Sequence, residues 1–161
     1  RKNRGMLLEM AAEAGDHWAG NIVFAGAPVD AQLQKAIGRH GLGGRVRAIH
    51  RPAHRLLVAL YSRCFAFVFP SFSEGFGWPT IEAQACGAPV IASNAQPMPE
   101  VSGGAALHAP PDDARAFGRA LIEITDLNRR ASLINAGHEN CLRFQIDKIM
   151  DQYRNLHGLD A

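Results

Sequence analysis

The chain has 161 residues, of which 47% are hydrophobic, and its charged side chains leave a formal net charge of only +2. That length corresponds to about one domain with a single well-buried core, and the apolar content is ordinary for a soluble globular domain. So small a charge argues against nucleic acid or a membrane surface as a partner. Because no run of about eighteen apolar residues occurs, we predict no transmembrane helix.

The first residues and the cysteines indicate the cellular setting. Arg1–Arg4 are largely basic, but no apolar run of the signal-peptide type follows them. Since the chain does not begin with Met, we expect it to be part of a longer protein. Cys64, Cys86 and Cys141 are widely spaced and form no CxxC pair, which favours buried free thiols in a reducing cytoplasm. We therefore expect a cytoplasmic protein; peripheral association with the cytoplasmic face of the membrane, through a half that is absent here, stays open.

Helix-like and strand-like segments alternate along most of the chain. In chain order they are helix 5–14, strand 21–26, helix 29–39, strand 45–49, helix 55–63, strand 65–69, helix 81–86, strand 89–93, a helical turn at 99–101, strand 105–108, helix 111–125, and a helix from 128 with a break near 144–145. Strands 65–69 and 89–92 are apolar without alternation, as expected of strands covered on both faces. This order predicts an α/β fold with a parallel sheet and helices on both faces.

The segment that joins strand 65–69 to helix 81–86 carries the chemistry. Residues 70–82 read PSFSEGFGWPTIE, so two glycines and two glutamates lie where a strand leads into a helix. Ligands bind at this carboxyl edge in open parallel sheets, and the N–H groups and dipole of a helix N-terminus favour an anion such as phosphate. Gly75 and Gly77 let the backbone approach a ligand closely, and Pro79 fits the first helical turn.

Glu74 and Glu82 stand on either side of the backbone amides of Phe76, Gly77 and Trp78. Ionised carboxylates only accept hydrogen bonds, so their partners are hydroxyls or amines, at roughly 1.5–3 kcal/mol for each bond. A diphosphate on the amides with sugar hydroxyls on the glutamates forms a coherent nucleotide-sugar site. Two other interpretations stay open: a solvated carboxylate with a helix-dipole partner, and a glycosidase pair, whose required separation the spacing does not set.

This ordered motif resembles the C-terminal domain of retaining glycosyltransferases of family 4, which have the two-Rossmann-domain GT-B fold. The family's E-x7-E signature usually reads EGFGLPxxEAxAxGxPV, and residues 74–90 here read EGFGWPTIEAQACGAPV. Other family-like pieces stand at residues 60–61, 69–71, 92–94, 99–101 and 110–113. The likeness runs from about Arg1 to Phe144. It implies a Rossmann-like nucleotide-sugar-binding domain over residues 1–144, followed by a C-terminal helical extension over residues 145–161.

The resemblance also implies roles for single residues. The donor-binding set would be Lys2, Glu74, Gly75, Phe76, Gly77, Trp78 and Glu82. Within it, Lys2 matches the lysine that neutralises the diphosphate, Glu82 would bond the ribose hydroxyls, and Glu74, the catalytic residue, would contact the donor sugar. His50 and Arg51 lie where relatives hold the base. Trp78 replaces a smaller apolar residue and is expected to reshape the sugar pocket.

The implied activity is transfer of a hexose from a nucleotide-sugar to a glycan or lipid-linked glycan, with retention. The donor is a substrate, and we expect no cofactor and no bound metal. The acceptor site would belong to an absent N-terminal domain, so we expect the isolated chain to be inactive. The alternatives are another GT-B enzyme, such as a nucleotide-sugar epimerase or a glucan phosphorylase, and a non-catalytic nucleotide-sugar-binding module. No lysine lies in residues 70–82 to hold pyridoxal phosphate, which counts against the phosphorylase.

Overall fold

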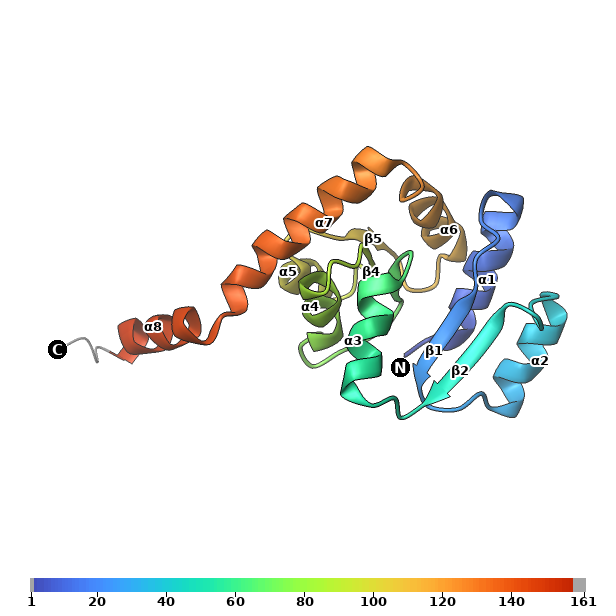
Figure 1. The fold of residues 1–161 in the computed structure, drawn as a ribbon, viewed down its shortest axis with the longest axis horizontal. Coiled ribbons are helices and arrows are strands. Elements are labelled where there is room, and N and C mark those ends of the chain that lie inside the picture. Colours follow the sequence, from blue (N-terminus) through green and yellow to red (C-terminus); the bar gives the residue numbers. More distant parts are fainter. Residues whose placement is uncertain (1, 158–161) are drawn as a thin grey trace.

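In the computed structural model, which describes residues 2–157, strands and helices alternate along the chain (Figure 1). The strands are β1 (Ile22–Gly26), β2 (Val46–His50), β3 (Phe67–Phe69), β4 (Val90–Ser93) and β5 (Leu107–Ala109). The helices are α1 (Arg4–Ala14), α2 (Ala31–Arg39), α3 (His54–Arg63), α4 (Trp78–Ala85), α5 (Met98–Ser102), α6 (Ala114–Glu123), α7 (Leu127–Cys141) and α8 (Ile146–His157). Short 3-10 turns follow α1 and α7, at Gly15–His17 and Leu142–Phe144. This alternation confirms the predicted α/β class.

The strands form two ladders, and every pairing in them is parallel. β1 pairs with β2, with Ile22 opposite Val46. The second ladder has the order β3-β4-β5. All four residues of β4 are buried, which confirms that this central strand is covered on both faces.

Helix α1 packs against both ladders. Its Met6 and Met10 belong to the apolar cluster that contains Ile91 of β4, whereas Leu8 belongs to the cluster that contains Phe24 of β1. A fully buried apolar side chain of this size contributes roughly 1.5–3 kcal/mol. α1 therefore holds the ladders together, although no strand pairing joins them within residues 2–157.

The predicted strand over residues 65–69 is too long. β3 begins at Phe67, whose N–H donates to the carbonyl of Pro89 at 2.8 Å, and β4 begins just beyond that proline. Phe65 therefore has no neighbouring strand, and it is 36% exposed. The guanidinium of Arg130 lies 5.0 Å from the Phe65 ring and donates to the Phe65 carbonyl. The expectation that the whole segment is buried on both faces was wrong for its first part.

A buried polar network fixes the position of α4. The side-chain amide of Gln84, which is fully buried, donates to the carbonyls of Ser102 and Ala105 at 3.2 and 3.1 Å. Asn140 of α7 donates in turn to Gln84 Oε1 at 2.8 Å and to the Val101 carbonyl at 2.9 Å. Buried amides need such partners, and here they join α4, α5 and α7.

Helix α8 extends from the end of α7, away from the rest of the chain (Figure 1). Its large apolar side chains are exposed and recur at helical spacing, so they form one stripe. They are Ile146, Ile149, Met150, Tyr153 and Leu156. No helix within residues 2–157 is long and apolar enough to cross a membrane.

The three cysteines are free and half-buried: Cys64, Cys86 and Cys141. The prediction of free thiols is confirmed, while their burial is only partial. Burial raises the pKa of the Cys64 and Cys141 thiols, which keeps them neutral.

Candidate functional site

The candidate site is the loop of residues 70–77, which joins the carboxyl end of β3 to the N-terminus of α4. Gly77 is the N-cap of α4 with φ of 101°, a backbone region that glycine adopts at no steric cost. A Cβ on Gly77 would lie 2.3 Å from Met98 Cε, so this position needs glycine for space as well. Ser93 Oγ donates to the carbonyl of Ser71 at 2.7 Å and ties the loop to β4.

Gly75 is a glycine for a different reason. Within residues 2–157, leaving out Gly75 and its two chain neighbours, no heavy atom lies within 4 Å of a Cβ built on Gly75, and the φ of Gly75 is not positive. Neither crowding nor backbone conformation therefore requires glycine here. The absence of a side chain here leaves the exposed backbone open to close approach by a ligand.

Three backbone donors at the start of α4 are unused. Within residues 2–157, the N–H groups of Phe76, Gly77 and Trp78 donate no hydrogen bond. The first N–H groups of a helix have no partner inside it, and the helix dipole places partial positive charge at the same end. This arrangement suits an anion.

Glu74, which lies in the same loop as these amides, forms an ion pair with Lys2, which lies just before α1. Lys2 Nζ donates to Glu74 Oε1 at 2.8 Å, and the Glu74 side chain is only 8% exposed whereas that of Lys2 is 49% exposed. The ammonium also lies 4.6 Å from the centre of the Phe69 ring, at the end of β3. The two residues, 72 positions apart in the sequence, thus meet at the carboxyl edge of the sheet.

Glu82, one turn into α4, has a tyrosine partner. Tyr61 Oη of α3 donates to Glu82 Oε2 at 3.3 Å. Burial, followed by the Glu82 carboxylate, raises the pKa of Tyr61, so the hydroxyl keeps its proton and stays a donor. Glu82 itself is exposed, so a carboxylate held by one hydrogen bond still faces solvent.

His50 and Arg51 lie at the carboxyl end of β2 and are exposed. His50 Nδ1 is 3.0 Å from the Gly26 carbonyl, and the Arg51 N–H donates to the same oxygen at 3.2 Å. Arg51 has φ of 44°, a conformation that costs a non-glycine residue about 1–2 kcal/mol. Within the described residues, no three His, Cys, Asp or Glu side chains gather in a way that could hold a metal ion.

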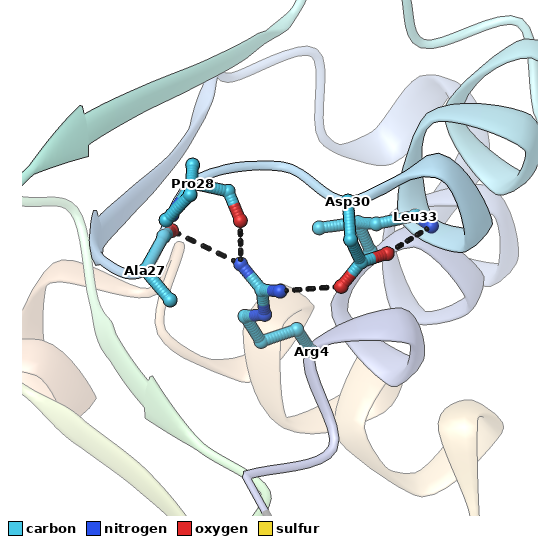
Figure 2. A network of polar contacts seen from close by, with 5 residues as sticks. All are labelled: Arg4, Ala27, Pro28, Asp30 and Leu33. Carbon is cyan, nitrogen blue, oxygen red and sulfur yellow. Dashed lines mark hydrogen bonds and ion pairs between the residues drawn. The ribbon is translucent and has the colours of Figure 1, made fainter.

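Arg4 joins the start of α1 to the turn after β1, as Figure 2 shows. Its guanidinium donates to the carbonyls of Ala27 and Pro28 at 3.1 and 2.7 Å and pairs with Asp30 at 2.8 Å. Asp30 Oδ1 accepts the Leu33 N–H at 2.8 Å and caps α2. One arginine therefore holds three elements at the same sheet edge.

A hollow of about 790 Å³ lies between the start of α1 and α2. Charged side chains of both signs and one aromatic ring line it, among them Lys2, Arg4, Asp30, Lys35, Arg39 and Phe72. Glu74 and Glu82 do not line it, so this hollow reaches the candidate site through Lys2 and through Phe72 of the loop.

Residues 1–140 match the protein family described as Glycosyl transferases group 1. The chain belongs to this family. It is also similar to O-antigen chain mannosyltransferase B of Escherichia coli, with 38% identity over 94 residues. That match covers 58% of this chain and 25% of the mannosyltransferase, so the chain spans only part of its relative.

Solved structures show that this group 1 glycosyltransferase domain has the fold of a GT-B C-terminal half. The C-terminal domain of LpcC, a group 1 family protein from Francisella tularensis, matches 90% of this chain and 80% of its own, with TM-score 0.77 and 23% identity. HepE of Anabaena, solved in complex with UDP and glucose, matches 98% of this chain and 45% of its own, with TM-score 0.84 and 21% identity. At these sequence identities the similarity to the two solved structures shows a shared fold and nothing about function.

The group 1 domain carries an aromatic cluster next to the loop. The ring centres of Phe76 and Trp78 are 4.8 Å apart, and both rings contact Phe144 at 6.0 and 6.3 Å. Trp78 is 51% exposed. A hollow of about 400 Å³ opens beside the cluster, and Arg143 and Lys148 also line it.

The structure brings the predicted site residues only partly together. Lys2 and Glu74 meet directly, whereas Glu82 lies with Tyr61, and His50 lies with the end of β1. Sequence reasoning missed Tyr61 and Arg4 as neighbours of the site. The basic start of the chain contained a signal for Arg4, but Lys2 was the one residue of that segment predicted to lie at the site.

Proposed function

We propose that this chain is the donor-binding domain of a retaining glycosyltransferase which, as a longer protein, transfers a hexose from a nucleotide-diphosphate sugar to a glycan or lipid-linked glycan. Family membership and the likeness to an O-antigen mannosyltransferase support sugar transfer. The fold shared with HepE, which was solved with UDP and glucose, supports a nucleotide-sugar donor. The observation that carries the proposal is the set of unused amides in the loop that also holds the Lys2–Glu74 ion pair.

In the proposed complex the diphosphate lies on the amides of Phe76, Gly77 and Trp78. Lys2 adds a full positive charge, and its ammonium has three N–H donors, of which Glu74 takes one. A charge-assisted hydrogen bond to phosphate is about twice as strong as a neutral one. Amides and ammonium together donate hydrogen bonds to the diphosphate and stabilise its negative charge.

Glu82 binds the ribose in this arrangement. Tyr61 donates to one of its carboxylate oxygens and so sets the orientation of the group, while the exposed side of the carboxylate accepts from ribose hydroxyls. His50 and Arg51, at the end of β2, contribute to the pocket for the base.

In the transfer step, the bond between the anomeric carbon and the diphosphate oxygen breaks. The acceptor hydroxyl oxygen bonds to the same carbon, and its proton passes to the leaving diphosphate oxygen. Negative charge grows on the leaving diphosphate, where preorganised donors act, and one such donor is worth about 2.7–4 kcal/mol. Glu74, the catalytic residue of this proposal, accepts from the sugar hydroxyls and positions the anomeric carbon. The resemblance to the family supports retention of configuration.

We further infer that residues 1–144 form the donor-binding unit, with residues 145–161 as a helical extension, and that the acceptor site lies in another domain. The short span of this chain on its relatives supports a second half, since it covers 25% of the mannosyltransferase and 45% of HepE. The free cysteines support a reducing cytoplasm as the location. Peripheral contact with the cytoplasmic membrane face would come through the other half.

Calorimetry of the 161-residue chain with UDP, GDP and their hexose conjugates tests the proposal. Glu82→Gln keeps the shape of the side chain and removes its charge, so nucleoside diphosphate affinity should fall about 10- to 100-fold. Glu139→Gln changes an exposed carboxylate on α7 and should leave affinity unchanged. Equal affinity of the wild type and Glu82→Gln would remove Glu82 from the ribose role. Absence of binding to every nucleotide would overturn the donor site as a whole.

A further inference from the structure

The position of the Lys2 ammonium depends on a flexible side chain. Four carbons separate the charge of a lysine from its backbone, and the Lys2 side chain is 49% exposed. Lys2 lies before α1, which begins at Arg4, so the helix does not hold it directly. The backbone of the residues that follow therefore decides where the side chain of Lys2 starts.

Asn3 holds this backbone from one side. It is the N-cap of α1 and has φ of 47°, a left-handed conformation that asparagine adopts more readily than most residues. Its side-chain amide donates to the carbonyl of Pro111, in the turn after β5. This hydrogen bond ties the residue next to Lys2 to the end of the β3-β4-β5 ladder.

Arg4 holds the same backbone from the other side (Figure 2). Its guanidinium donates to the carbonyls of Ala27 and Pro28 and pairs with Asp30, all in the turn between β1 and α2. The Arg4 side chain is only 26% exposed. Because these contacts involve both terminal nitrogens, Arg4 directs its charge to the chain itself and leaves contact with a ligand to Lys2.

The turn between β1 and α2 is a suitable anchor because other contacts hold it. The Gly26 carbonyl accepts the Arg51 N–H from the end of β2 at 3.2 Å. Asp30 Oδ1 accepts the Leu33 N–H at 2.8 Å and caps α2. Arg4 therefore joins the start of α1 to a turn that β2 and α2 already fix.

We propose that Arg4 is a positioning residue for Lys2: it fixes the start of α1 on this turn and thereby keeps the Lys2 ammonium against Glu74 and beside the anion site. The role of this ammonium towards a diphosphate rests on the proposed function above, whereas its ion pair with Glu74 exists without a ligand. Loss of Arg4 lets residues 2–4 move, so that Lys2 samples other rotamers and the loop amides lose their charged neighbour. Arg4 thus affects anion binding only through Lys2.

Calorimetry with inorganic pyrophosphate, in the absence of divalent metal ions, measures the effect on the anion site. Arg4→Met should weaken pyrophosphate binding about 3- to 10-fold when Lys2 is present, and less than about 2-fold when combined with Lys2→Met, because groups in one network are coupled. The matched control Arg39→Met removes the same charge from the lining of the same hollow. It should change pyrophosphate affinity less than about 2-fold, since exposed charges at a distance are screened by salt.

Asp30→Asn separates positioning from overall charge. Asparagine keeps an oxygen that can accept the Leu33 N–H, so the cap of α2 is retained while the ion pair with Arg4 is lost. Removal of a negative charge by itself favours anion binding, whereas loss of positioning weakens it. We expect pyrophosphate affinity to fall about 2- to 5-fold.

Side-chain NMR signals of Lys2 test the positioning without a ligand, and Lys2→Met assigns them by their disappearance. In Arg4→Met and Asp30→Asn these signals should move towards their positions in Glu74→Gln, in which the ion pair is absent. Arg39→Met should leave them at their wild-type positions.

The proposal is overturned if the Lys2 signals keep their wild-type positions in Arg4→Met. It is also overturned if Arg4→Met weakens pyrophosphate binding equally with and without Lys2→Met, or if Asp30→Asn strengthens that binding. A wild-type chain that binds no pyrophosphate would overturn the donor site, and the NMR comparison would then decide the positioning of Lys2 by itself.

Discussion

Gly77→Ala should destabilise the fold by about 2–3 kcal/mol. The backbone at Gly77 has φ of 101°, and the left-handed region costs a non-glycine residue about 1–2 kcal/mol. The added Cβ would also lie 2.3 Å from Met98 Cε, and Met98 is only 1% exposed. Because Cε is the end of an unbranched side chain, moving it costs about 1 kcal/mol, at the low end of the range for overpacking.

Urea denaturation followed by circular dichroism measures this loss as a shift in midpoint at unchanged slope. Gly75→Ala is the matched control, because among the described residues, its two chain neighbours apart, no heavy atom lies within 4 Å of the added Cβ. It should leave the free energy of unfolding within about 0.5 kcal/mol of the wild type or raise it slightly, while weakening nucleotide-sugar binding. The double variant Gly77→Ala/Met98→Ala should lose less free energy of unfolding than the two single variants lose in sum, because the close contact between the added Cβ and the Met98 side chain is absent. A loss below about 0.5 kcal/mol for Gly77→Ala would refute the reasoning.

Two further predictions concern stability. Asn140→Ala should lower the free energy of unfolding by about 2–4 kcal/mol. It leaves two buried acceptors, Gln84 Oε1 and the Val101 carbonyl, unpaired at about 1–3 kcal/mol each. The control Asn135→Ala, at an exposed position of the same helix, should change the free energy of unfolding by less than about 0.5 kcal/mol. Burial lowers the pKa of His108 below its usual value of 6.5, so the unfolded state binds more protons and stability should fall as the pH drops below about 6.5. His108→Gln should flatten that fall in urea denaturation between pH 7 and pH 5, and an unchanged slope would contradict it.

The fold was predictable where the signals are local. Glycine and proline at segment ends, such as Gly15 and Pro89, marked most boundaries, and the apolar run that became β4 indicated a buried parallel strand. The loop of residues 70–77 was visible for the same reason, because its glycines and glutamates lie within a few positions of each other. Local sequence also explains the error at Phe65, whose apolar character suggests a strand although no neighbouring strand reaches it.

Contacts between distant segments could not be predicted. Tyr61 and Glu82 are 21 positions apart, and Gln84 and Asn140 are 56 apart. Such pairs depend on how α3, α4 and α7 pack, which a periodic pattern does not specify. The division of the strands into two ladders was likewise invisible, because each strand has the composition of a sheet interior whether or not both of its edges are paired.

The exposed stripe of α8 has a practical consequence for handling the protein. Among the described elements, α8 contacts chiefly the turn that precedes it, and an unsupported helix of twelve residues is marginal in water. We therefore expect trypsin to cleave the peptide bonds that follow Lys148 and Arg154 well before it cleaves any bond in the sheet. Purified material should shorten from this end during storage, and detergent or a docked surface that shields the stripe should slow the trimming.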